Sequence, residues 1–265
     1  MVRRPAAHHA ERMSQTPAST KTALLDVAGL TKVFGGLQAV NNCTFQVEPG
    51  VITGLIGPNG AGKTTAFNMI SGVLRPDGGT VHFDGREITG LMPHKVARRG
   101  VGRTFQITRE LADLTVLENM VVPTVRGGFG SLMGARMFRH EQERAMALLD
   151  FVGITHLATE KAKNLSFGQR KLLEFASVLM AEPKLVLLDE PAGGVNPALL
   201  ERMMDRIKSL NDDGLTFLIV EHNMDVVMTL CKSIVVMAHG EVLLQGSPSM
   251  VQEDHRVLDA YLGKV

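Results

Sequence analysis

The stretch with the clearest chemical meaning is a glycine-rich segment, Gly57–Thr65, with the sequence GPNGAGKTT. It fits the pattern G-x-x-x-x-G-K-[ST], which is typical of loops that cradle the phosphates of a nucleotide. Its glycines allow positive φ and let backbone amides approach an anion closely. Lys63 adds a positive charge for the β- and γ-phosphates, and the Thr64 hydroxyl is an oxygen ligand suited to Mg²⁺.

The segments around this loop support the same interpretation. Val51–Ile56 is a short apolar run typical of a buried strand, and residues 64–70 have helical character. A helix that begins at a glycine-rich loop presents unpaired N–H groups to a phosphate. An ordinary glycine-rich turn is the alternative, but residue frequencies give this pattern in on the order of one in a hundred chains of this length. We therefore favour nucleotide binding.

A second chemical signal follows the apolar run Leu185–Leu188, which predicts a parallel strand buried on both faces. The run ends in Asp189 and Glu190, and ligands bind at this end of the strands in a parallel α/β sheet. Buried carboxylates are costly without a cation or a chemical task. We interpret Asp189 as a Mg²⁺-side carboxylate and Glu190 as the base that polarises an attacking water. Two loop carboxylates that face water are the alternative.

Leu215–Val220 is a similar apolar run and ends in Glu221 and His222. A lone histidine is more often structural than catalytic. At the end of a core strand in this series, His222 is a candidate for sensing a γ-phosphate.

The segment Leu165–Gln169 precedes a predicted helix with apolar residues at helical spacing. Ser166 suits an N-cap, and Gly168 leaves the start of the helix open. One interpretation is structural, a helix capped by Ser166. The other is functional, a second helix N-terminus that binds an anion. The residues placed on its polar side are Gln169, Arg170, Lys171 and Glu174.

Composition limits the class of protein. The net charge of +1 gives no electrostatic reason to expect nucleic acid binding. Cys43 and Cys231 have no metal-like spacing; a disulfide stays open, although a reducing cytosol is the simpler setting. No apolar run approaches the roughly 20 residues that span a bilayer. For a membrane process, we expect another chain to supply the span.

Residues 1–22 are interpreted as a disordered tail without periodicity. Its arginine pair is not followed by an apolar stretch, so we do not expect a secretion signal, and Met13 is an alternative start. Further predicted elements are two strands around Gly35-Gly36, a strand at 80–83, helices at 93–99, 115–122 and 140–152, a hairpin turn at His239-Gly240 and short helices at 248–251 and 255–262.

Together these pieces resemble the ATP-binding cassette (ABC) ATPases over roughly Leu24 to Gly263. Asp189 and Glu190 match the Walker B pair, His222 the switch histidine, and 194–197 the D-loop position. Leu165–Gln169 matches the signature motif, with Phe167 in place of the usual Gly. Phe34 takes the place of the adenine-stacking Tyr, Val40 matches a common adenine contact, and Gln106 matches the Q-loop glutamine. The Walker A residues are Gly57, Pro58, Asn59, Gly60, Ala61, Gly62, Lys63, Thr64 and Thr65.

The resemblance implies ATP and Mg²⁺ as cofactors. It implies catalytic roles for Glu190, His222 and Lys63, and Mg²⁺ contacts for Thr64, Gln106 and Asp189. Two cassettes, identical or different, meet head to tail, with ATP between Walker A of one and Ser166 and Gly168 of the other. The implied fold is α/β: a RecA-like P-loop NTPase core with a mixed sheet and an N-terminal antiparallel β edge. The nucleotide-binding domain spans 23–265 and contains an inserted helical subdomain at about 107–168.

Finer features resemble the cassettes of branched-chain amino acid importers, including Phe34–Leu37, Gly102–Gln106, Val220–Met224 and Ala260–Gly263. This resemblance implies a peripheral protein at the cytoplasmic face of the inner membrane. Its partners are a second ATPase subunit, two permease subunits and an extracytoplasmic (periplasmic) substrate-binding protein. The alternatives are a urea or amide importer, a lipopolysaccharide-export ATPase, a soluble non-transport ABC ATPase and a regulatory module without turnover.

Overall fold

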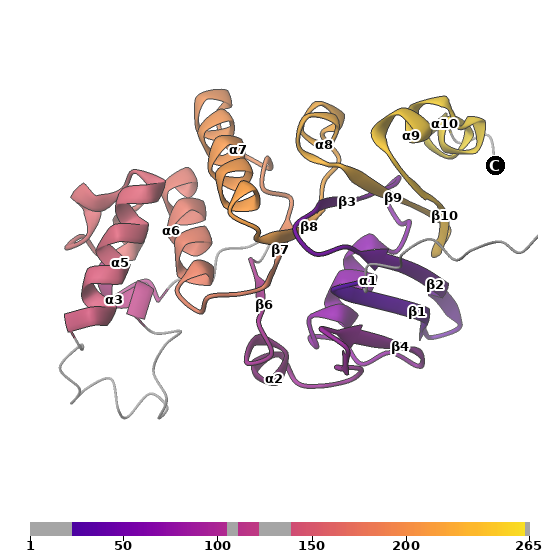
Figure 1. Cartoon of the computed structure of the whole chain (residues 1–265), viewed down its shortest axis with the longest axis horizontal. Helices are drawn as coiled ribbons and strands as arrows, with labels where there is room; N and C mark the ends of the chain where they lie inside the picture. Colours follow the sequence, from indigo (N-terminus) through magenta and orange to yellow (C-terminus); the bar gives the residue numbers. More distant parts are fainter. Residues whose placement is uncertain (1–22, 105–110, 122–138, 263–265) are drawn as a thin grey trace, which may run out of the picture.

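The computed structural model describes residues 23–104, 111–121 and 139–262, and these form two sheets with helices around them (Figure 1). The predicted tail, Gln106 and parts of the predicted helical subdomain lie outside the described residues. The strands are β1 Leu25–Phe34, β2 Leu37–Val47, β3 Ile52–Ile56, β4 Gly78–Phe83, β5 Arg86–Glu87, β6 Val101–Arg103, β7 Leu185–Asp189, β8 Thr216–Val220, β9 Ser233–Ala238 and β10 Glu241–Gly246. The helices are α1 Lys63–Ile70, α2 Pro93–Ala97, α3 Val116–Val121, α5 Arg139–Val152, α6 Phe167–Leu179, α7 Pro197–Asp212, α8 Met224–Leu230, α9 Pro248–Glu253 and α10 His255–Leu262, with 3₁₀ turns at Thr155–Leu157 and Ala162–Asn164.

The larger sheet is mixed and has the order β10-β9-β3-β8-β7-β6. Strands β9, β3, β8, β7 and β6 are parallel, and β10 is antiparallel at the edge. All five residues of β3, β7 and β8 are buried, as the apolar runs predicted. This agrees with the expected α/β class.

The smaller sheet is antiparallel, with the order β2-β1-β4-β5. It is the predicted N-terminal β edge, and the turn between β1 and β2 contains the predicted glycine pair. The hairpin between β9 and β10 is also confirmed, because His239 (φ 49°) and Gly240 (φ 83°) both adopt the left-handed conformation that a tight two-residue turn requires.

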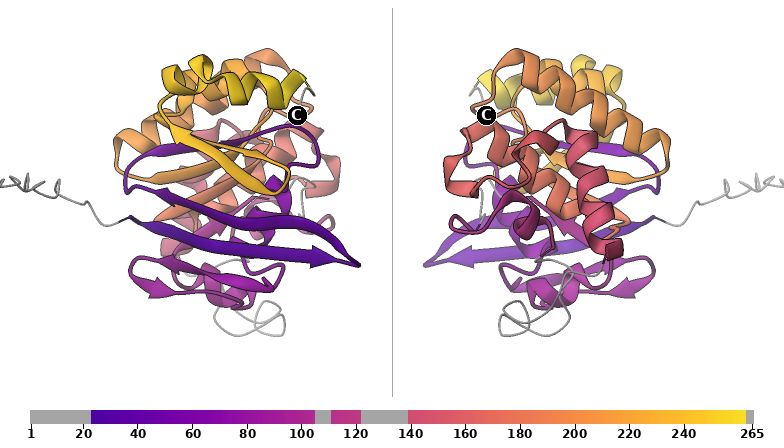
Figure 2. Two further views of the ribbon diagram at one scale, coloured as in Figure 1. Left: turned by 90° about the vertical axis from the view of Figure 1, so that its right-hand side faces the viewer. Right: turned by 90° about the vertical axis from the view of Figure 1, so that its left-hand side faces the viewer.

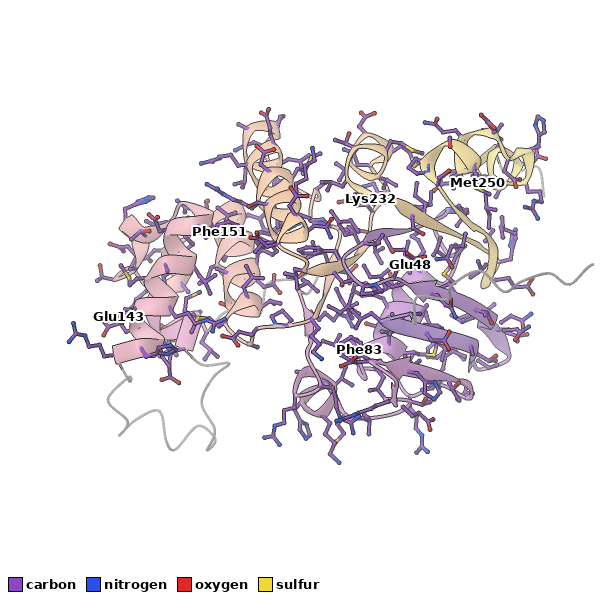
Figure 3. The ribbon with its side chains drawn as sticks, viewed as in Figure 1. Glu48, Phe83, Glu143, Phe151, Lys232 and Met250 are labelled. Carbon is purple, nitrogen blue, oxygen red and sulfur yellow. The ribbon has the colours of Figure 1, made fainter. Side chains whose placement is uncertain are left out.

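Alternating side chains of the large sheet enter two different cores. In one core, Leu55, Leu187 and Leu218 of the large sheet pack with residues of α1 and of the small sheet, so α1 lies between the two sheets. The other joins Ile56, Leu188 and Ile219 to α3 and to helices α5–α8. Figure 2 shows helices α7–α10 over one face of the sheet. Phe83 of the first core and Phe151, packed on the second, are labelled in Figure 3.

Helices α3, α5 and α6 pack on one another at one end of the molecule (Figure 1). The division of the chain into a domain and an inserted helical subdomain stays a prediction. No described helix has both the length and the apolar character that crossing a bilayer demands.

Candidate functional site

The glycine-rich loop joins buried strand β3 to helix α1, which is the predicted strand–loop–helix arrangement. Gly57 (φ 147°), Gly60 (φ 80°) and Gly62 (φ 93°) all have positive φ. A Cβ at Gly57 would lie 2.0 Å from the carbonyl oxygen of Met237, whereas nothing lies within 4 Å of one at Gly60. The loop therefore packs tightly against β9 at its start and is open at its tip.

Helix α1 begins at Gly62 without a side-chain cap, so side chains leave its first amides available to an anion. Lys63 Nζ donates to the carbonyl oxygens of Gly57 (2.7 Å) and Pro58 (2.9 Å), which keeps the ammonium at the loop. Burial lowers the pKa of Lys63, and the charge of Glu190 opposes this shift. The lysine and the predicted base therefore belong to one electrostatic site, although they are 127 positions apart in the sequence (190 − 63).

The sheet order places the other predicted residues beside this loop. Because β3, β8 and β7 are adjacent and parallel, their carboxyl ends meet at one edge. Asp189 ends β7, and Glu190 and His222 follow β7 and β8. The Nδ1 atom of His222 lies 3.8 Å from a carboxylate oxygen of Glu190. Lys63, Asp189, Glu190 and His222 are thus brought to the same edge, as the sequence predicted.

Asp189 has a partner that the sequence reasoning missed. It is buried, and Arg103 Nη2 at the end of β6 lies 3.3 Å from its Oδ2. Burial raises the pKa of Asp189, while the charge and hydrogen bond of Arg103 oppose the rise. The signal available in the sequence was a charged residue in the strand-like stretch that became β6.

The two predicted adenine contacts differ in exposure. Phe34 lies at the end of β1 with 47% of its surface exposed, and Lys32 Nζ is 5.6 Å from its ring centroid. A ring in this position is available for stacking. Val40 is fully buried, and its side chain would lie 3.2 Å from a Cβ at Gly62. Val40 therefore packs behind the loop, and its contact with a base stays a prediction.

The signature segment forms the N-terminus of α6. Ser166 caps this helix in a reciprocal capping box with Gln169. A Cβ at Gly168 would lie 2.4 Å from Leu199 Cδ2, so this glycine allows α6 to approach α7. In Figure 1, α6 lies well apart from α1. Ser166 and Gly168 are therefore not brought to the phosphate loop of the same chain.

One residue of α6 differs from its predicted place. We predicted Lys171 on the polar side of the helix, but it is only 8% exposed. Its ammonium instead binds backbone carbonyls of the segment after β7. The helical spacing was right, but a lysine can occupy a buried position where carbonyl oxygens satisfy its charge.

The donors and acceptors at this edge fit a nucleotide with a divalent cation. The open loop tip, uncapped helix amides and Lys63 suit phosphate, and the exposed Thr64 hydroxyl and the Asp189 carboxylate are oxygen ligands of the kind Mg²⁺ takes. Among the described residues there is no cluster of three or more His, Cys, Asp or Glu side chains that could hold a metal unaided.

Comparison with known proteins agrees with this geometry. The family model described as "ABC transporter" matches residues 40–193. The chain belongs to the ABC transporter family. Because the cassettes of this family hydrolyse ATP, the chain is an ATPase. The predicted binding of ATP is supported by the same similarity.

Relatives similar to this cassette over nearly its whole length include three ATP-binding proteins. A probable branched-chain amino acid transport ATP-binding protein LivG of Archaeoglobus fulgidus is 42% identical over 91% of this chain and 95% of the relative. The high-affinity branched-chain amino acid transport ATP-binding proteins BraF of Pseudomonas aeruginosa and LivG of Escherichia coli are 40% and 39% identical, each over 91% of this chain and 98% of the relative.

Solved structures agree on the fold. A nucleotide-free ATP-binding cassette from an ABC transporter is 34% identical, with a TM-score of 0.81 over 91% of this chain and 99% of the other. The ADP conformation of an ATP-binding cassette has the same identity and coverage and a TM-score of 0.82. The expected P-loop ATPase fold is confirmed.

Proposed function

We propose that this cassette powers the import of branched-chain or other aliphatic amino acids through separate membrane permeases. The observation that carries the proposal is its similarity, over nine-tenths of the chain, to ATP-binding proteins named for branched-chain amino acid transport. None of the described residues of this chain need touch the cargo, because the cassette supplies ATP hydrolysis and other subunits supply specificity.

In the proposed site, the phosphate loop and Lys63 bind the phosphates, and Phe34 stacks on the adenine. Thr64, Asp189 and Gln106 would hold Mg²⁺, which would neutralise charge on the phosphates. Glu190 takes a proton from the attacking water, and His222 lies beside Glu190 where it can contact the γ-phosphate. Val40 supports the loop from behind.

We infer that a complete site needs two cassettes. Ser166 and Gly168 lie apart from the phosphate loop of their own chain, and beside them a cavity of about 490 Å³ is lined by Phe167, Gly194 and Asn196. A second copy of the chain, or a related one, would place its bound ATP at this surface. A solved cassette that is 26% identical, with a TM-score of 0.75 over 84% of this chain and 98% of the other, is dimeric.

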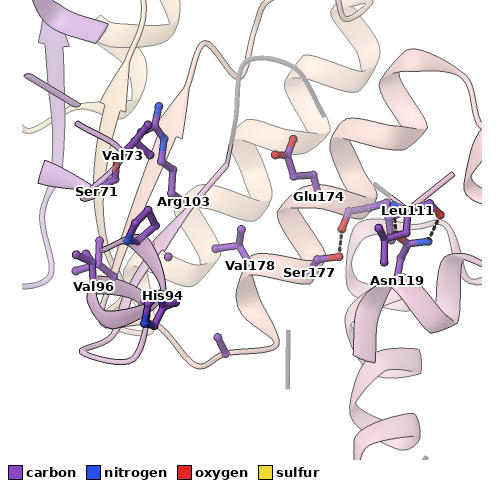
Figure 4. Close-up of a pocket in the computed structure, with 16 residues that line it drawn as sticks. Ser71, Val73, His94, Val96, Arg103, Leu111, Asn119, Glu174, Ser177 and Val178 are labelled. Atoms are coloured by element: carbon purple, nitrogen blue, oxygen red, sulfur yellow. Dashed lines mark hydrogen bonds between the residues drawn. The ribbon is translucent and has the colours of Figure 1, made fainter. Parts of the chain in front are cut away.

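The permease is proposed to bind in a groove of about 410 Å³ between the core and the helical end of the molecule. Figure 4 shows Val96 of α2 and Arg103 of β6 on one side, and Val178 of α6 and Asn119 of α3 on the other. Much of the lining is apolar, and Leu111 comes from the segment that follows Gln106. A short amphipathic cytoplasmic helix of a membrane permease fits this chemistry. Such docking would hold the cassette at the cytoplasmic face of the membrane.

A deletion strain tests the transported substrate. We expect uptake of labelled leucine, isoleucine and valine to fall when the chain is deleted and to return when it is supplied from a plasmid. The Glu190→Gln variant, expressed at the same level, should not restore uptake. Unchanged amino acid uptake with failed lipopolysaccharide export, or with lost urea uptake, would instead assign the corresponding alternative. If uptake of the amino acids, uptake of urea and export of lipopolysaccharide were all unchanged, a non-transport role would be favoured.

A further inference from the structure

The segment after β7, residues 190–193, is bound by a buried lysine from a different element. Lys171 of α6 donates from Nζ to the carbonyl oxygens of Glu190 (2.8 Å), Gly193 (2.6 Å) and Pro191 (3.4 Å). The ring of Phe167 lies 5.4 Å from the same ammonium. The hydrogen bonds that satisfy this buried charge thus go to carbonyl groups of the predicted catalytic base and its neighbours.

Three backbone amides, one after β7 and two after β8, are bound by a buried carboxylate. Glu221 is fully buried and accepts from the backbone N–H of Ala192 (2.7 Å), His222 (3.0 Å) and Asn223 (3.2 Å). It therefore connects the segment after β7 to the segment after β8. Both segments carry a residue of the proposed active site, Glu190 and His222.

Glu190 itself has an unfavourable backbone conformation. Its φ is 48°, in the left-handed region that residues with a Cβ seldom adopt. Its carbonyl accepts from Lys171 and from the amide of Gly193 (3.0 Å), and its amide donates to Val220 (2.9 Å). These contacts stabilise a conformation that the chain would not keep alone.

We propose that Lys171 and Glu221 are positioning residues for hydrolysis. Lys171 binds carbonyls of residues 190, 191 and 193, and Glu221 binds the amide of Ala192 in the same segment. Together they hold the carboxylate of Glu190 at its place beside His222. The two side chains also stabilise each other electrostatically: burial lowers the pKa of Lys171, and the charge of Glu221 is the largest influence that raises it. This inference rests on the proposed role of Glu190.

The first experiment compares Lys171→Met, which removes the charge but keeps much of the length, with the purified wild-type chain. We expect the Kd for ATP, measured by calorimetry, to stay within about twofold, because the phosphate loop is untouched. We expect kcat of ATP hydrolysis to fall about tenfold or more, because Glu190 loses its fixed orientation. Lys163→Met is the matched control, since Lys163 is an exposed lysine paired with Asp113 at 3.0 Å, and it should leave both quantities unchanged.

A double-mutant cycle separates positioning from general stability. In a Glu190→Gln background, Lys171→Met should change the residual single-turnover rate by less than about threefold, because the carboxylate that it positions is already absent. An equal loss of rate in both backgrounds, or a parallel loss of ATP binding and kcat, would overturn the proposal. Normal turnover by Glu190→Gln alone would instead reject the proposed base, whatever Lys171 does.

Two milder variants keep the test decisive if Lys171→Met does not fold. Lys171→Arg keeps the charge, but a planar guanidinium cannot place one nitrogen at three converging carbonyls, so kcat should fall partially. Glu221→Gln turns a donor toward backbone N–H groups and should lower kcat with little change in ATP affinity. Full activity in both folded variants would show that neither side chain positions Glu190.

Discussion

Arg103 and Asp189 form a buried ion pair at the carboxyl ends of adjacent strands β6 and β7, with 3.3 Å between Nη2 and Oδ2. The guanidinium also donates to Ser71 Oγ and lies 4.9 Å from the ring centroid of Phe67 on α1. The same arginine lines the groove proposed for the permease. A residue in the docking groove is therefore in direct contact with the carboxylate proposed to face Mg²⁺.

Arg103→Gln should shift ATPase activity toward higher pH. Arg103 counteracts the rise in the pKa of Asp189 that burial causes, so its removal should raise that pKa further and leave more of the carboxyl protonated at any given pH. The Mg²⁺ concentration for half-maximal ATPase should increase, most strongly at low pH. Breaking the buried pair should also cost about 3–5 kcal/mol of stability. Titrating Mg²⁺ between pH 6 and 9, with exposed Arg98→Gln as control, checks this; identical pH profiles would reject it.

Lys63→Ala should lose most ATP affinity. A charge-assisted hydrogen bond contributes roughly 1.5–3 kcal/mol, which corresponds to an increase in Kd of about 10- to 100-fold. The exposed Lys95→Ala serves as control. Calorimetry on the folded variant is the measurement, and near-normal binding would show that the loop does not hold the phosphates through this lysine.

Glu190→Gln should bind ATP but hydrolyse it at least about 100-fold more slowly, because the amide cannot accept the proton of the attacking water. ATP-bound dimers should then accumulate and elute early on gel filtration, since hydrolysis no longer separates them. The exposed Glu201→Gln on α7 is a matched control. Undiminished turnover would assign the base to another residue.

Ser166→Arg should leave nucleotide binding by one chain nearly intact and block both the closed dimer and hydrolysis. The reason is that Ser166 lies apart from the phosphate loop of its own chain and is proposed to contact the ATP of the partner. Ser166→Asp keeps an N-cap and separates capping from docking. Equal losses of ATP binding and turnover in Ser166→Arg would point instead to a structural role for the cap.

Both cysteines should resist alkylation in the folded chain. Cys43 and Cys231 are buried free thiols, and burial raises the pKa of each to about 12. At pH 8 both groups are neutral thiols, which are poor nucleophiles. Iodoacetamide followed by mass spectrometry should show no labelling natively and two labels after unfolding. Rapid native labelling of either would contradict its burial.

Local sequence patterns were sufficient for the parts of the site that depend on neighbouring residues. The loop Gly57–Thr65, the strands that end at Asp189 and at Val220, and the cap at Ser166 could all be predicted. Turn chemistry, apolar runs and helix capping act over a few residues. The shared order of apolar strand and polar end predicted that Glu190 and His222 follow core strands, whereas the 3.8 Å approach of their side chains came from the structure. The adenine contact of Val40 and the Mg²⁺ contact of Gln106 rested on resemblance.

The contacts of Arg103, Lys171 and Glu221 were decided only by the tertiary structure. Each is a charged residue whose burial the sequence did not predict. Lys171 and Glu221 are buried, and the Arg103 side chain is only 9% exposed, among elements distant in the chain. Lys171 lies beside Glu190 because α6 is placed against the segment that follows β7, a relationship between residues 19 positions apart that no local periodicity encodes. The sequence by itself was enough to predict which residues are candidates for the chemistry, since that depends on side-chain type and local backbone. The packing of the sheet and helices decided which buried charges hold those residues in place.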